Sequence, residues 1–234
     1  MTQQELPSGL KNIVESPQTL DTLFSALLPA VGDFLQSDRC FLYLHNPQND
    51  LGRVAFCWIR TPDVPTVYNE DWAAQPPTLV EEDPMFAAAL RAEPSIFVED
   101  VETAAPQVLN REFEQKNFGH RALIHAHIRQ DGQLWGILQP CIFGHPRTWT
   151  EYERGVINSL VDKITPFAVS YVKSAFNSLV LLTYLLTVLN YVQRFYILQP
   201  TLTNGICIPP IRGLRKDGEN HNTSLVLIFR HPYL

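Results

Sequence analysis

The 234-residue sequence lacks the motifs that mark the commonest catalytic and metal-binding sites. Its four cysteines include no C-x-x-C pair, the spacing of zinc sites and dithiol redox centres. It also has no phosphate-binding glycine loop, no H-E-x-x-H and no G-x-S-x-G. These absences argue against nucleotide hydrolysis, zinc proteolysis and serine hydrolysis. We therefore predict a protein that is not an enzyme and has no metal ligands.

Positive charge is also scarce, with 18 Lys and Arg against 24 Asp and Glu. Residues 1–174 carry 13 basic and 22 acidic side chains, a net charge of −9, whereas residues 175–234 carry 5 and 2. An acidic main body cannot neutralise a phosphate backbone, so nucleic acid is not an expected partner. Residues 1–9 are polar and do not resemble a signal peptide. Together with isolated cysteines, this predicts a cytoplasmic protein with reduced thiols.

What is present is a regular alternation of helix and strand patterns. Apolar periodicity and capping residues predict helices at 18–36, 83–93 and 109–117, and a further helix from Thr150, where Glu153 completes a capping box. Thr165-Pro166 resembles a second helix start, so we expect this last helix either to kink or to restart there. Short apolar or alternating runs predict strands at 40–45, 53–60, 95–100, 120–129 and 133–142. The Asp131-Gly132 pair predicts a tight hairpin between the last two strands. This order predicts an α+β fold, an antiparallel sheet covered by helices.

Three runs resemble the GAF domain, and in particular the GAF domains of the phytochrome and cyanobacteriochrome photoreceptors. They are "SDRCFLYLHN" at 37–46, "RALIHAHIRQDGQLWGIL" at 121–138 and "GHPRTWTEYE" at 144–153. The resemblance covers about residues 18–173. It implies a central antiparallel sheet with helices on one side and a pocket under short helices on the other.

The sequence departs from these relatives where they attach a bilin chromophore. Bilin-binding members use a Cys, usually followed by His, in the short helix before the penultimate strand, and here that helix reads "LNREFEQKN". A subgroup adds a second Cys in an Asp-x-Cys-Phe motif, where this chain has "DPMF" with Met85 in place of the thiol. The resemblance thus implies no covalent bilin. An unknown ligand held without a covalent bond, including a bilin or haem, remains open.

Two groups of residues invite a reactive interpretation. His125 and His127 alternate on one strand face, where they would either ligate haem iron or hold its propionates, or form hydrogen bonds on a half-exposed face. We favour hydrogen bonding, because no third ligand is identifiable. Cys141 and His145 would need an orienting partner and an oxyanion hole to act as a nucleophile pair, and a strand-to-helix connection is the better interpretation. The predicted pocket-lining residues are Met85, Phe86, His125, His127, Trp135 and Cys141.

We divide the chain into an N-terminal segment (1–17), a GAF domain (18–173), an apolar helix (174–198) and an irregular tail (199–234). Residues 174–193 carry no charge and are long enough to span a bilayer, but leucines also recur at the spacing of a dimer seam, at positions 179, 182, 186 and 189. Both interpretations stay open.

The functional prediction is a non-enzymatic sensory module that forms a homodimer, because its apolar helix needs a partner surface. It would pass a small-ligand or protein-partner signal to a separate protein. The alternatives are a dimerising or membrane-associated adaptor without ligand, and a protein that binds a tetrapyrrole non-covalently.

Overall fold

The computed structural model describes residues 4–15 and 19–197, and within the last helix it leaves the side chains of 178–184 and 192–197 undescribed. Contacts divide the chain into two units, Met1–Leu185 and Leu186–Leu234. The first unit contains an antiparallel six-stranded sheet with the strand order β3-β2-β1-β6-β5-β4. The predicted α+β class is therefore confirmed. The predicted tail, residues 199–234, lies outside the described residues.

The central strands are β1 (Arg39–Asn46), β6 (Gln133–Ile142) and β5 (Ala122–Gln130), and the outer ones are β2 (Leu51–Ile59), β3 (Ala73–Ala74) and β4 (Ile96–Val98). The tight turn between β5 and β6 forms as predicted. Asp131 has φ 55° and Gly132 has φ 73°, the left-handed pair that a two-residue hairpin turn requires.

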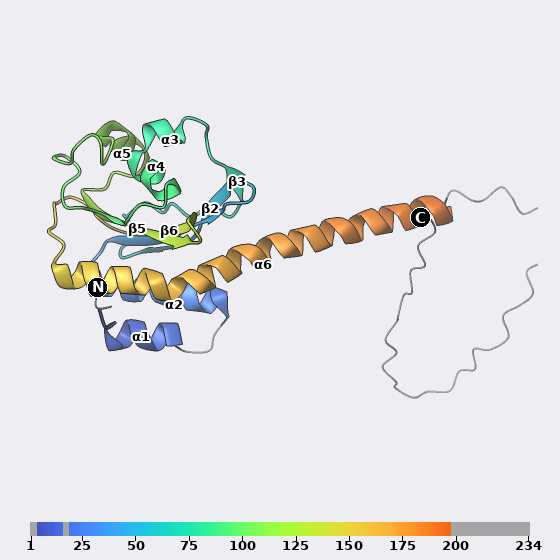
Figure 1. Ribbon diagram of the computed structural model, residues 1–234, viewed down its shortest axis with the longest axis horizontal. Coiled ribbons are helices and arrows are strands. Elements are labelled where there is room, and N and C mark those ends of the chain that lie inside the picture. The colour runs from blue at the N-terminus through green and yellow to red at the C-terminus, as the bar shows by residue number, and fades with distance from the viewer. Residues whose placement is uncertain (1–3, 16–18, 198–234) are drawn as a thin grey trace, which may run out of the picture. The chain divides into compact units, whose positions relative to one another are not determined.

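Helices cover the two faces of the sheet differently (Figure 1). One face carries α2 (Leu20–Leu35) and the first part of α6 (Glu151–Ile197), and α1 (Ser8–Glu15) packs on α2. The other face carries three short helices, α3 (Leu79–Glu82), α4 (Pro84–Leu90) and α5 (Arg111–Asn117). Helix α1 and the short elements β3 and α3 were not predicted, because each is too short to show a period in the sequence.

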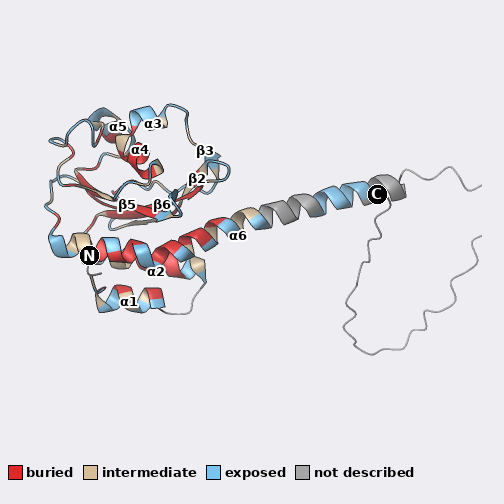
Figure 2. Ribbon diagram, viewed as in Figure 1, coloured by how far each residue is buried: buried red, intermediate tan, exposed pale blue. Residues whose placement is uncertain are grey.

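The large core lies between the sheet and the long helices (Figure 2). Helix α2 contributes Phe24, Leu27, Leu28, Val31 and Leu35, none of which is more than 1% exposed. Helix α6 adds a second apolar stripe that includes Val156, Leu160, Ile164 and Val172. At about 25 cal/mol per Å² of buried apolar surface, this layer is the main source of stability.

Helix α6 begins at the predicted capping box. The Thr150 amide donates to Glu153 Oε2 at 2.8 Å, and the Glu153 amide donates to Thr150 Oγ1 at 3.2 Å. The helix does not restart at Pro166, one of the two predicted alternatives, and continues as a single helix to Ile197. The proline removes one backbone hydrogen bond, while packing of Ile164, Ala168 and Val169 into the core holds the helix on both sides.

A β-bulge in β6 decides which way Trp135 points. Ile128 pairs with Gly136 and Arg129 with Leu134, so Trp135 is an extra residue opposite β5. Its neighbours Leu134 and Ile137 belong to the face under the short helices, whereas Trp135 packs in the core of the long helices. Lys173 of α6 lies over its ring, with 5.4 Å from Nζ to the ring centroid.

No helix in the part of the chain that the structure describes is long and apolar enough to cross a membrane. This finding tests the predicted apolar helix at 174–198 only in part, because residue 198 and several side chains before it lie outside the described residues.

Candidate functional site

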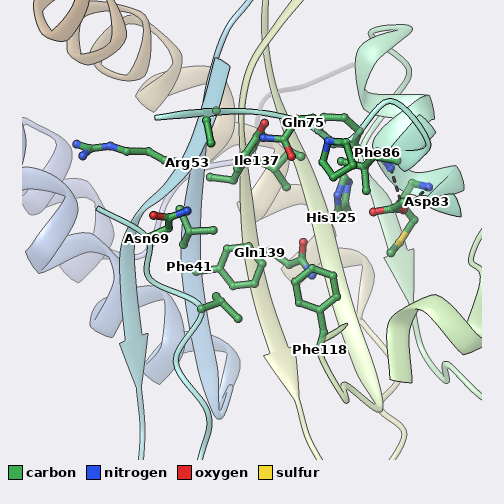
Figure 3. A pocket seen from close by; sticks show the side chains of 18 of the residues that line it. Phe41, Arg53, Asn69, Gln75, Asp83, Phe86, Phe118, His125, Ile137 and Gln139 are labelled. Carbon is green, nitrogen blue, oxygen red and sulfur yellow. Dashed lines mark hydrogen bonds between the residues drawn. The ribbon is translucent and has the colours of Figure 1, made fainter. Parts of the chain in front are cut away.

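A cavity of about 370 Å³ lies between the sheet and the short helices (Figure 3). Strands β1, β2, β5 and β6 form its floor, α3, α4 and α5 its cover, and a loop that includes residues 67–76 its remaining wall. Most of the lining is apolar or aromatic, from Phe41, Val54, Val67, Leu79, Met85, Phe86, Phe113, Phe118 and Ile137. Its size lies near the low end of the roughly 300–1,000 Å³ typical of small-molecule sites.

The start of α4 places a carboxylate at the cavity. Asp83 is the N-cap, as its position before Pro84 predicts, and its Oδ1 accepts from the amides of Met85 at 3.0 Å and Phe86 at 3.1 Å. Burial raises the pKa of Asp83 to about 6, and the charge of Glu114 acts in the same direction, although the two backbone hydrogen bonds oppose them. The Asp83 carboxyl group therefore changes charge near neutral pH.

Two histidines of β5 form a chain of hydrogen bonds that ends at the cavity. His127 Nδ1 lies 2.8 Å from the carbonyl oxygen of Glu93, and His127 Nε2 lies 2.8 Å from His125 Nδ1. His125 lines the cavity, while His127 lies behind it. Burial lowers the pKa of both imidazoles, so both are neutral at pH 7. The hydrogen-bonded reading of this pair holds, but both side chains are buried rather than half-exposed.

A second buried polar chain links α5 to β1. Glu114, which lines the cavity, pairs through Oε1 with Nδ1 of His120, and His120 Nε2 contacts the guanidinium of Arg39. Arg39 is fully buried and also donates to the carbonyl oxygen of Pro65. Burial lowers the pKa of His120, against the opposing effect of Glu114. A neutral His120 donates to Glu114 and accepts from Arg39, so both ring nitrogens of His120 are paired, whereas Arg39 Nε is buried without a partner.

Other polar groups at the cavity have no protein partner. The hydroxyl of Tyr43 is buried without a hydrogen bond. Gln139 is 4% exposed, and its side-chain amide has no partner among the described residues. Tyr43 reaches the cavity edge only because residue 52 is glycine: a Cβ built there would lie 1.9 Å from the Tyr43 hydroxyl. Buried polar groups almost always form hydrogen bonds, so unpaired ones around a cavity indicate a missing occupant.

The wall loop of the cavity contacts helix α6. Arg53, at the cavity edge, turns its guanidinium away from the cavity and donates to the Glu70 carbonyl oxygen and to the Tyr171 hydroxyl, the latter at 2.9 Å. Trp72 of the loop packs on Phe176 of α6, with 4.9 Å between ring centroids. The loop that borders the cavity is therefore also part of the surface on which α6 rests.

Three of the six predicted pocket residues, Met85, Phe86 and His125, line this cavity. Trp135 does not, because the bulge in β6 turns it to the opposite face of the sheet. Cys141 faces the correct side but is packed among apolar side chains beyond the lining. Burial raises the pKa of its thiol, which makes it a poor nucleophile.

Sequence reasoning missed Arg39, Glu114, His120 and Gln139. Glu114 lies in a short helix dense in charge, where nothing distinguishes one buried carboxylate from its solvated neighbours. Gln139 did carry a signal, since it is a lone amide in the apolar run of β6. Cys40, in strand β1, packs in the core of the long helices.

Comparison with known proteins is consistent with this geometry. The sequence model of the GAF domain family matches residues 19–165. No curated protein matches the chain. Among solved structures, the phycoerythrobilin-bound GAF domain of a cyanobacterial phytochrome is 18% identical with a TM-score of 0.52, covering 70% of this chain and 95% of that one.

Two further structures extend the comparison. GAF3 of a Synechocystis protein, in its photoproduct state, is 23% identical with a TM-score of 0.51, covering 68% of this chain and 98% of the other. The GAF domain of an Acinetobacter phosphoenolpyruvate-protein phosphotransferase is 14% identical with a TM-score of 0.52, covering 69% and 91%. At these identities the likeness shows the fold alone. With the family match over most of its ordered sheet and helices, the chain belongs to the GAF domain family.

Proposed function

We propose that the protein is a non-enzymatic sensory module that holds a small ligand without a covalent bond and passes its presence to a separate protein. One observation carries the proposal: the cavity has unpaired polar groups inside it, and its wall loop packs on α6. A ligand that orders the loop would change the contacts of Trp72 with Phe176 and of Arg53 with Tyr171. Ligand binding would thus alter the packing of helix α6.

The arrangement of thiols supports non-covalent binding. Of the three cysteines that the structure describes, none lines the cavity. Met85 occupies the position at which some relatives carry a second bilin-attaching Cys, and a thioether does not add to a bilin as a thiolate does. A structural neighbour is described as binding phycoerythrobilin. A non-covalent tetrapyrrole remains a candidate, although the cavity volume suits a smaller ligand.

The buried titratable groups support binding rather than catalysis. His120 is held between Glu114 and Arg39, and His127 between a backbone carbonyl and His125. His120 and His127 therefore have both ring nitrogens paired, whereas a general base needs access to the proton that it removes, so neither of these two imidazoles is suited to catalysis.

We further propose that α6 pairs with a second copy of the chain. Several of its large apolar side chains are exposed, including Leu186 at 52% and Leu189 at 57%. These leucines are three residues apart, the spacing of a two-helix seam. The alternative is that this apolar stripe binds to a membrane surface.

Mass spectrometry of protein purified from its natural host tests ligand binding. The native mass should exceed the sequence mass by that of one small molecule, and denaturation should remove the difference. A mass that persists after denaturation would indicate covalent attachment. A native mass equal to that of the chain would favour an adaptor without ligand.

Sedimentation of the full chain tests the seam. The chain should be a dimer, and Leu186→Glu combined with Leu189→Glu should make it a monomer, because buried charge opposes helix pairing. Val188→Glu is the matched control, since Val188 is also exposed but lies on another side of the helix. If the wild-type chain is monomeric, or if Val188→Glu acts equally strongly, the seam is not at these leucines.

A further inference from the structure

The hydrogen-bond chain of β5 fixes the position of each imidazole proton. The Glu93 carbonyl oxygen only accepts, so His127 Nδ1 carries a hydrogen and, in a neutral ring, His127 Nε2 is bare. His127 Nε2 must then accept from His125 Nδ1, 2.8 Å away. Neutral His125 is left with a bare Nε2. This atom has no hydrogen-bond partner among the described residues, and the His125 ring is 3% exposed and lines the cavity.

A second hydrogen-bond acceptor, a carboxyl oxygen of Asp83, lies near His125. Asp83 uses Oδ1 to cap α4, and its other carboxyl oxygen has no partner in the described part of the chain. Figure 3 shows His125, Asp83 and Phe86 at the same end of the cavity. An acceptor that faces the cavity without a protein donor is completed only by a donor from the occupant, so this end selects for a ligand that brings a hydrogen.

The charges around the cavity disfavour an anionic ligand. Among the lining side chains, Asp83 and Glu114 are acidic, and Arg53 alone carries a permanent positive charge. The Arg53 guanidinium points away and is held by Glu70 and Tyr171. A phosphate or carboxylate in the cavity would lie near two acids without a facing cation.

We infer that the cavity takes an uncharged, flat, aromatic ligand that donates a ring N–H to His125 Nε2. This inference rests on the proposed ligand-binding function and specifies its chemistry. The aromatic rings of Phe41, Phe86 and Phe118 suit a planar ligand, and His127 acts as the positioning residue that sets the tautomer of His125. The unpaired amide of Gln139 is available to a second polar atom of the ligand.

Two small probes of nearly equal shape isolate the hydrogen bond. Indole carries a ring N–H, and benzofuran has an oxygen in its place. Titration of the full chain should show tighter binding of indole, by roughly 3- to 10-fold, the value of one net hydrogen bond. Indole-3-carboxylate, which adds a negative charge, should bind more weakly than indole.

A readout on the unaltered protein avoids the risk that a variant fails to fold. The ¹⁵N resonance of His125 Nε2 should move upfield when indole binds, because a bare imidazole nitrogen then accepts a hydrogen bond, and benzofuran should leave it nearly unchanged. His125→Phe should remove the preference for indole while retaining benzofuran binding. His145→Phe makes the same change at an exposed histidine outside the cavity lining, and this control should keep the preference.

The outcomes separate this inference from the function on which it rests. Equal binding of indole and benzofuran, with an unmoved ¹⁵N resonance, would overturn the donor requirement but leave the cavity as a binding site. Tighter binding of the carboxylate would overturn the charge argument. Binding of none of the three probes would overturn the inference, whereas the proposed ligand-binding function is tested separately by the native mass of the protein from its natural host.

Discussion

The two faces of the sheet are built from the same strands but from different kinds of residue. On β5, alternate positions facing the long helices are Ala122, Ile124, Ala126 and Ile128, all fully buried and apolar. The positions between them are Leu123, His125 and His127, also buried but in part polar. On β5 the side chains of both faces are therefore equally buried, and the two faces differ in the polarity of those side chains.

The difference separates stability from binding. Apolar side chains on the helix-covered face gain free energy from leaving water and need no partners. On the cavity-covered face each buried imidazole, carboxylate or amide costs free energy unless it forms hydrogen bonds. Two chains of hydrogen bonds offset part of that cost, but the Tyr43 hydroxyl is buried without a partner. His125 and Gln139 line the cavity, and His125 Nε2 and the Gln139 amide have no hydrogen bond within the described part of the chain. Such groups are tolerable where a ligand completes them.

The largest effect is expected on the helix-covered face. Trp135→Ala should lower the free energy of unfolding by about 3–5 kcal/mol, because it opens a cavity in the main core. Chemical denaturation measures this loss. The Trp135→Ala protein that remains folded should bind indole almost as tightly as the wild type does, because Trp135 lies on the far side of the sheet from the cavity. A Trp135→Ala protein that is fully stable but cannot bind would reverse the assignment of the faces.

The next effect comes from Asp83. Its folded-state pKa of about 6 exceeds its ordinary value of 3.8, so between these pH values the folded protein keeps a proton that the unfolded chain releases. The contribution of Asp83 to stability therefore falls as pH rises from 4 to 6. Asp83→Asn retains a capping side chain and removes the titration. The unfolding free energy of Asp83→Asn minus that of the wild type should therefore increase by about 3 kcal/mol as the pH rises from 4 to 7.5, because the pKa of Asp83 is raised by roughly two units.

Asp63→Asn provides the control of opposite sign. Asp63 is exposed, and a hydrogen bond from Thr61 lowers its pKa. Its contribution is present above its ordinary pKa and lost as pH falls, so Asp63→Asn should not gain stability relative to wild type as pH rises. If both variants follow the same pH profile, burial of Asp83 is not the cause.

The smallest effect is expected at Gln139, in the same strand as Trp135 but facing the cavity. Gln139→Leu replaces an unpaired amide with an apolar side chain of similar size, so the unfolding free energy should stay the same or rise by about 0.5–1 kcal/mol. A loss of more than about 1 kcal/mol would show that the amide has a stabilising partner. Comparison with Trp135→Ala then measures the contrast between the two faces within one strand.

Sequence patterns predicted the elements that depend on neighbours in the chain. The Asp131-Gly132 turn, the Asp83 cap and the Thr150–Glu153 capping box all involve residues within three positions, and all form as predicted. Strand alternation placed His125 and His127 on one face. The order of elements, with the resemblance to GAF domains, was sufficient for the fold.

The remainder depended on contacts between distant residues. Trp135 was assigned to the pocket because strict alternation was assumed, and a one-residue bulge moved it to the other face. The chain of Glu114, His120 and Arg39 joins positions up to 81 residues apart. No local pattern indicates such a pairing. A restart at Pro166 was one of two predicted alternatives because the cost of the proline is local, whereas the packing that holds the helix together is not.

Amide hydrogen exchange gives the most direct test of the central claim, that occupancy of the cavity reaches α6. The protein as purified from its natural host would be compared with the same protein after unfolding, removal of small molecules and refolding. The account predicts slower exchange in the loaded protein at loop 67–76 and in α6 around Tyr171–Phe176, with α2 unchanged. Slower exchange in the loop with identical exchange in α6 would contradict it.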